Sequence, residues 1–75
     1  MTVKNLFVVL TGNNSIQFST DTCEKYGIED KVYCRQDFFH KFRRSEVWDM
    51  KIANLNTHTR PLFNTTQTIL TITLK

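Results

Sequence analysis

The side chains that could ligate a metal ion or act as nucleophiles are two histidines and two cysteines: His40, His58, Cys23 and Cys34. No pair of them has the spacing of about two to five residues that structural zinc sites use. Cys34 and His40 are six positions apart, which does not bring them to one face of a helix. The sequence therefore predicts no metal site, no catalytic residue and no enzymatic activity.

The chain also lacks the glycine-rich loop that would hold a phosphate group or a cofactor. Its two glycines, Gly12 and Gly27, are far apart, whereas such loops need several glycines close together. Seventy-five residues also leave little interior for a ligand pocket of about 300 Å³ or more. We therefore expect a single domain over residues 1–75 without a cofactor, and both cysteines as reduced, buried thiols.

Binding chemistry is concentrated between residues 33 and 50. Lys41, Arg43 and Arg44 form a basic cluster, and four aromatic residues are interspersed around it: Tyr33, Phe38, Phe42 and Trp48. Cations neutralise phosphates and exposed aromatic rings stack on bases, so a small basic nucleic-acid-binding domain is one hypothesis. The alternative, which the apolar spacing favours, is that Phe38, Phe39 and Phe42 form the core and the cations solvate a helix end.

Strands are predicted on both sides of this segment. Residues 3–10 and 15–20 alternate in the manner of strands, and the Gly and Asn residues of 11–14 predict a hairpin turn between them. Residues 46–55 alternate in the same way, and residues 65–75 are rich in Thr and Ile, which favour a sheet.

One main helix is predicted within residues 29–44, because the grouping of Phe38, Phe39 and Phe42 suits a helical face better than a strand. A short strand over residues 31–35 is the competing interpretation. The sum is an α+β domain of order β-β-α-β-β, with a four-stranded antiparallel sheet and one helix on one face.

Two connections complete this prediction. Residues 22–26 form a single helical turn that ends at Gly27, and residues 54–64, which are polar and contain the only proline, form a long loop. Nine residues are expected to be buried: Leu6, Val8, Ile16, Phe18, Phe39, Trp48, Ile52, Leu70 and Ile72.

One helix cannot cover both faces of such a sheet, and Phe7, Val9 and Ile69 would lie on or near the uncovered face. An apolar surface of this kind usually marks an interface. The final strand would also have a free edge that a partner strand could join. The leading hypothesis is therefore a non-catalytic protein that occupies a site on another protein.

The size, composition and layout of the chain are similar to those of small phage accessory proteins that bind and inhibit a host factor. No apolar run reaches the roughly 18 residues of a membrane span, and residues 6–10 are too short for a signal peptide. We therefore expect a cytoplasmic protein without membrane contact, whose partner is a host protein, or a second copy in a homodimer. The residues predicted to bind the partner are Phe7, Val9, Tyr33, Lys41, Arg43, Arg44, His58 and Arg60.

Overall fold

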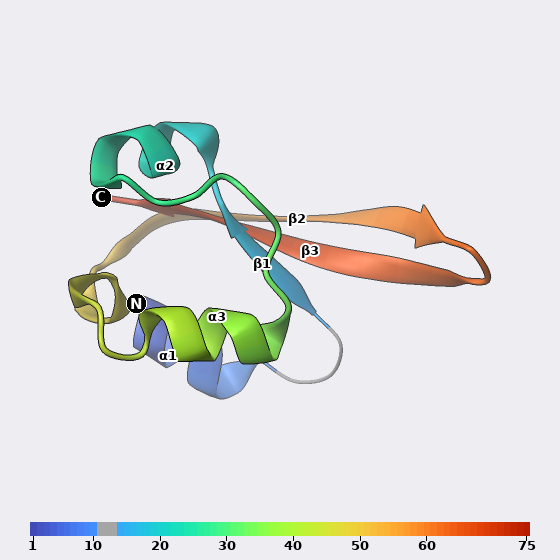
Figure 1. Ribbon diagram of the computed structural model, residues 1–75, viewed down its shortest axis with the longest axis horizontal. Coiled ribbons are helices and arrows are strands. Elements are labelled where there is room, and N and C mark those ends of the chain that lie inside the picture. Colours follow the sequence, from blue (N-terminus) through green and yellow to red (C-terminus); the bar gives the residue numbers. More distant parts are fainter. Residues whose placement is uncertain (11–13) are drawn as a thin grey trace.

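A computed structural model describes residues 1–10 and 14–75 (Figure 1). Their order is α1 (Val3–Val9), β1 (Ser15–Phe18), α2 (Thr20–Tyr26), α3 (Arg35–Phe42), the 3₁₀ helix η1 (Glu46–Asp49), β2 (Ile52–Leu62) and β3 (Thr65–Leu74). The α+β class is confirmed. The predicted four antiparallel strands and single main helix are wrong, because the described residues form three α-helices and a three-stranded mixed sheet.

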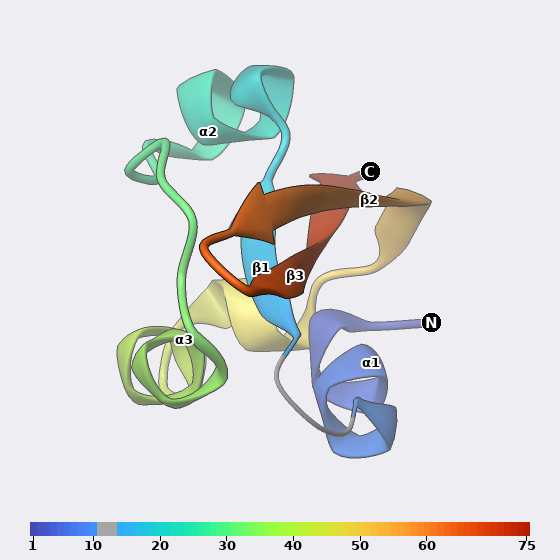
Figure 2. The ribbon, with the colours of Figure 1, turned by 90° about the vertical axis from the view of Figure 1, so that its right-hand side faces the viewer.

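The central strand of the sheet is β3, in the order β1-β3-β2. β1 runs parallel to β3 with Ser15 opposite Ile69, and β2 runs antiparallel to β3 along its whole length. The free edge predicted for the final strand therefore belongs mainly to β2. Figures 1 and 2 show α1 and α3 together below the strands and α2 above them.

The predicted strand at residues 3–10 is a helix. Thr2 and Asn5 form a capping box, in which the Thr2 hydroxyl accepts from the Asn5 N–H and the Asn5 side chain accepts from the Thr2 N–H. Val3 and Leu6 are buried on the inner face of α1, while Val8, predicted to be in the core, is 70% exposed. The first hairpin is therefore wrong, and the turn predicted at 11–14 lies largely outside the described residues.

The predicted helix within 29–44 exists only over Arg35–Phe42. The preceding segment is extended and pairs with β1, because Tyr33 and Ile16 exchange two main-chain hydrogen bonds of 2.8 and 2.9 Å. The competing strand at 31–35 is therefore represented by one isolated bridge. α2 is longer than the predicted single turn, but it ends at Gly27 as expected, with a left-handed φ of 67°.

The predicted strand at 46–55 begins as η1, which is capped by the Ser45 hydroxyl accepting from the Val47 N–H. The predicted loop at 54–64 is wrong, because β2 extends to Leu62 and forms a hairpin with β3. The strand predicted at 65–75 is confirmed as β3.

The core contains five of the nine residues expected there, namely Leu6, Ile16, Phe18, Leu70 and Ile72. Phe39, Trp48 and Ile52 are only half-buried. Aromatic rings dominate the interior around Phe38, whose ring lies within 4.9–6.3 Å, centroid to centroid, of five other rings. The buried apolar residues outside those nine are Val3, Cys23, Tyr33, Phe38, Phe42, Val47, Ile69 and Leu74. Burial of Cys23 was expected of a reduced thiol, and that of Phe38 and Phe42 agrees with the favoured interpretation that these rings belong to the core.

Candidate binding surfaces

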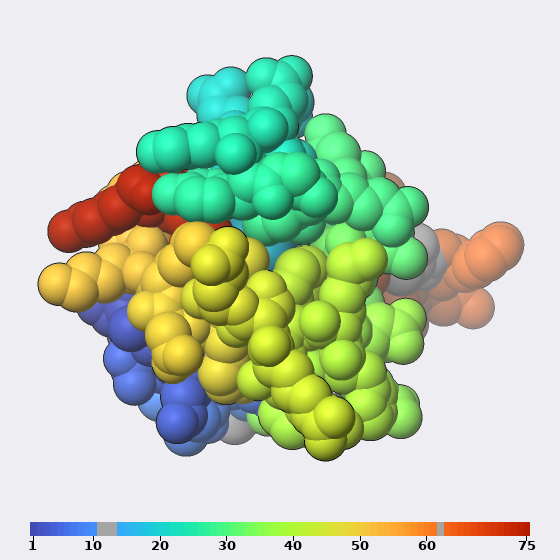
Figure 3. Space-filling model, turned by 60° about the vertical axis from the view of Figure 1, so that its left-hand side comes forward, coloured from blue at the N-terminus to red at the C-terminus, as the bar shows by residue number. Residues whose placement is uncertain are grey.

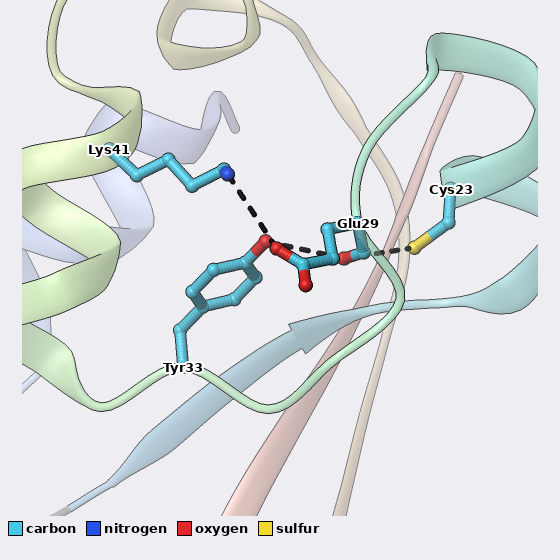
Figure 4. A network of polar contacts seen from close by, with 4 residues as sticks. All are labelled: Cys23, Glu29, Tyr33 and Lys41. Carbon is cyan, nitrogen blue, oxygen red and sulfur yellow. Dashed lines mark hydrogen bonds and ion pairs between the residues drawn. The ribbon is translucent and has the colours of Figure 1, made fainter.

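Two of the predicted partner-binding residues stabilise the fold. Tyr33 is only 2% exposed, and its hydroxyl donates to the main-chain oxygen of Glu29 at 3.2 Å (Figure 4). The ammonium group of Lys41 lies 3.9 Å from the Glu29 carboxylate and 5.9 Å from the centroid of the Tyr33 ring. Tyr33 therefore has almost no surface for a partner, and Lys41 faces the loop that precedes α3.

The same region contains the buried thiol. The Cys23 thiol donates to the Phe18 main-chain oxygen at 3.6 Å and also approaches the Glu29 main-chain oxygen. Burial, reinforced by Asp30 and Glu24, raises the pKa of Cys23. Burial and the Glu29 carboxylate likewise raise the pKa of Tyr33. Cys34 is also a free thiol but is exposed, contrary to the expectation that both would be buried.

An open cleft of about 400 Å³ lies between α1 and α3, lined by Phe7, Arg35, Gln36 and Phe39. We call it the aromatic cleft. The rings of Phe7 and Phe39 are stacked, with centroids 5.3 Å apart, and Trp48 lies 5.2 Å from Phe7 and 5.9 Å from Phe39. Phe7 was predicted to lie on an uncovered sheet face. It instead projects from a helix and forms one wall of this cleft.

Two guanidinium groups lie on the rings of the aromatic cleft. That of Arg35 lies 4.7 Å from the centroid of Phe7, and that of Arg43 lies 5.5 Å from the centroid of Phe39. Arg44, the next residue in the sequence, is exposed. The predicted basic cluster is therefore divided: the guanidinium group of Arg43 lies near the Phe39 ring at the border of the cleft, whereas Lys41 is directed to the other side of α3.

Val9, the other residue assigned to the uncovered sheet face, is the last residue of α1 and is 64% exposed beside Val8. It does not line the cleft. Its exposed side chain is one apolar position on a helix surface, and Ile69 is fully buried. Residues 1–10 and 14–75 therefore do not form the surplus apolar sheet face that motivated the sequence hypothesis.

The second prominent surface is the distal half of the β2–β3 hairpin, residues 59–68, which we call the arm. The described pairing of β1 with β3 starts at Ile69, so within the described residues the arm consists of two strands only. The molecule measures 37 × 23 × 19 Å, and the arm extends along its longest dimension (Figure 1). In Figure 3 the arm points away from the viewer, and its orange outer part projects beyond the rest of the surface at the right. Two predicted site residues, His58 and Arg60, lie at its base and along it, and both are exposed.

The base of the arm is joined to the sheet by side chains. The Arg60 guanidinium donates to the Gln67 side-chain oxygen at 2.7 Å, and the Gln67 amide donates to the hydroxyl of Ser15. Ser15 is buried at the start of β1. Arg60 therefore helps to orient the arm, while His58 lies opposite Ile69 with its side chain exposed.

Phe63, at the tip of the arm, was not among the predicted site residues. It is the most exposed large apolar side chain of the described residues, at 108% relative exposure, and the only non-glycine residue among them with a positive φ, 39°. Left-handed backbone is uncommon for a bulky residue and costs free energy. The sequence signal was the pair Phe63-Asn64 between two Thr-rich runs, since Asn often occupies tight hairpin turns.

Comparison with protein families, curated proteins and solved structures gives no match for this chain. Within residues 1–10 and 14–75, no three His, Cys, Asp or Glu side chains gather in a way that could hold a metal ion. None of the helices described is long and apolar enough to cross a membrane. The function of the chain is therefore inferred from the geometry of the aromatic cleft and of the arm.

Proposed function

We propose that this chain is a non-catalytic binding protein that occupies a site on another protein, and that the arm makes the contact. If the chain is phage-encoded, the partner is a host protein in the cytoplasm. The observation that carries the proposal is Phe63, a fully exposed aromatic ring at the end of a projecting hairpin. Aromatic side chains are common anchors of protein interfaces, and this ring contributes no packing to its own fold.

The backbone of Phe63 supports the same proposal. A left-handed residue with a large side chain costs stability, and such strain in a native protein is a reason to suspect a functional role. Asn or Gly would suit this turn better. The ring is therefore present despite its local conformational cost and not because the hairpin requires it.

The outer edge of β2 offers a second mode of contact. Proteins commonly protect edge strands with charges, prolines and bulges. In β2 the bulge lies between Ile52 and Asn54, and the proline is Pro61 near the tip. Residues 54–60, which lie between them, are protected by neither feature. The one charged residue in that stretch is Arg60. A partner strand could therefore add to this edge, with Phe63 as the anchor at its end.

The test compares affinity-tagged wild-type protein with Phe63→Asn and Val9→Asn in quantitative co-purification from host lysate. Val9→Asn is the matched control, because it makes the same apolar-to-Asn change at an exposed site on α1. We expect wild type and Val9→Asn to enrich the same protein. We expect Phe63→Asn to weaken that binding by about 30-fold, the effect of an anchor worth about 2 kcal/mol.

Light scattering distinguishes a foreign partner from a second copy. If the wild type is a dimer that Phe63→Asn converts to a monomer, the arm serves self-association. If the wild-type monomer enriches no protein, or Phe63→Asn enriches it equally well, the proposal is wrong.

A further inference from the structure

We propose that the aromatic cleft is a stacking site for one base of a single-stranded nucleic acid, with Arg35 and Arg43 neutralising the flanking phosphates. This site is separate from the arm and does not depend on the protein contact proposed above. It also differs from the nucleic-acid surface expected from the sequence. Three of the rings assigned to that surface are buried, namely Tyr33, Phe38 and Phe42.

The walls of the cleft suit a planar ligand. Phe7 and Phe39 are half-buried, and their rings are stacked on each other with planes 23° apart, so each has one face against the other ring. A base would therefore stack on the outer part of one ring, in place of the guanidinium group that lies over it, and that group would turn to a flanking phosphate. The uncharged polar side chain of the lining is Gln36, whose amide can both donate to and accept from the edge of a base. A volume of about 400 Å³ accommodates one such group. Stacking on aromatic rings is the main sequence-tolerant contact in single-strand recognition.

The charge around the cleft selects for an anion. Residues 35–44 contain four cations and one carboxylate, Asp37, which gives +3 and equals the net charge of the whole chain. The one ion pair among the described residues involves Lys41, on the other side of α3. Arg35 and Arg43 therefore lie on aromatic rings without a neutralising carboxylate, and phosphates flanking a stacked base would supply the missing charge.

A single strand fits this cleft better than a duplex does. In a duplex the bases are paired and stacked on one another, so their faces are not available to side chains. A cleft that takes one planar group needs an unstacked base with its backbone free on both sides. The two guanidinium groups lie near two different rings of the cleft, so a cation stands beside each ring.

The only tryptophan of the chain makes the test direct. Trp48 packs behind both walls, so a base in the cleft is expected to quench its fluorescence. The probe is an oligodeoxythymidine of about eight nucleotides, within the ~4–16 nucleotide site size of small single-strand-binding folds. It is titrated into full-length wild type, Arg35→Gln, Arg43→Gln and Phe39→Leu, and thermal unfolding checks that each variant is folded.

We expect saturable quenching, and each of Arg35→Gln and Arg43→Gln should reduce the slope of log affinity against log salt by about 0.7. Phe39→Leu should weaken binding by about 5- to 150-fold, the loss of one stacked base. Arg44→Gln and Lys41→Gln are the matched controls, because each removes one exposed cation that does not contact the rings of the cleft. They should keep the quenching and have the smaller effect on affinity.

Two results would overturn the proposal. One is no quenching at low salt by this oligonucleotide, while the protein is folded. The other is an equal loss of affinity for all four charge variants, since that pattern indicates general electrostatic attraction and no defined site. Neither result affects the arm, whose contact is tested by Phe63→Asn.

Discussion

Replacing Phe63 by Asn should leave the protein as stable as the wild type or make it more stable. The ring is fully exposed, so its removal uncovers no buried apolar surface and creates no cavity. A left-handed conformation costs an ordinary residue about 1–2 kcal/mol, and Asn tolerates that conformation far better than Phe. We therefore expect a gain of up to about 1 kcal/mol, which for a domain of this size raises the melting temperature by roughly 4–8 °C.

Thermal unfolding followed by circular dichroism measures this change, and Phe63→Val is the matched control. Val is β-branched and suits a positive φ worst, so it should lower the melting temperature although its side chain is equally exposed. The order Asn, Phe, Val from most to least stable is the signature of a backbone effect. A lower melting temperature for Phe63→Asn than for wild type would refute the reasoning, because it would mean that the ring contributes packing.

Three further outcomes are expected. Phe38→Ala should lower the free energy of unfolding, measured by urea denaturation, by about 3–5 kcal/mol. Trp48→Ala should lower it distinctly less, because Trp48 is only half-buried; equal losses for the two variants would contradict this difference in burial. Because the pKa values of Cys23 and Tyr33 are raised above 9.0 and 10.0, the folded chain holds these protons longer than the unfolded chain. Stability should therefore fall as the pH rises through about 9 for Cys23 and about 10 for Tyr33, because the unfolded chain loses each proton before the folded chain does. Cys23→Ala should remove the contribution of the thiol to this loss of stability. If the free energy of unfolding of Cys23→Ala falls with alkaline pH as steeply as that of the wild type, Cys23 makes no such contribution. Iodoacetamide should alkylate Cys34 and spare Cys23 in the native protein, so a doubly alkylated intact mass would contradict the burial of Cys23.

The parts of the fold that the sequence predicted are those where one face is buried and the other is not. In β3 the alternation of Leu70, Ile72 and Leu74 with Thr residues matches the buried face in the structure. Gly27 could be assigned because only a residue without a side chain adopts its φ at low cost. Both signals are local, so no knowledge of the tertiary structure was needed.

α1 was missed although its signal is present in the sequence. Val3, Leu6, Phe7 and Leu10 follow the helical spacing of i, i+3, i+4 and i+7, and Thr2 and Asn5 form a capping box at the start of the helix. The run of apolar residues also satisfies a period of two, and the β-branched valines favour that choice. Packing against η1 and α3, which no local pattern contains, decides between the two.

The aromatic cleft was predictable only in part. The sequence indicated cations and rings in one segment, but it could not separate buried rings from exposed ones. Tyr33 enters the core because its main chain pairs with Ile16, a contact between residues distant in the sequence. Phe7 reaches Phe39 for the same kind of reason, since α1 and α3 pack together only in the folded chain.

The β2 half of the arm was predicted to be a loop because both of its faces are exposed. A strand exposed on both faces has no buried side to impose alternation, so its sequence carries no period of two. Residues 53–61 are all exposed, and their Asn, Thr and His residues therefore look like a connection. An isolated two-stranded hairpin is at best marginally stable in water, and here the continuous pairing of β2 with β3, together with the Gln67–Ser15 bond, connects it to the body. A partner strand on the β2 edge would supply the third strand that the arm lacks, so binding and ordering of the arm would be coupled and each would strengthen the other.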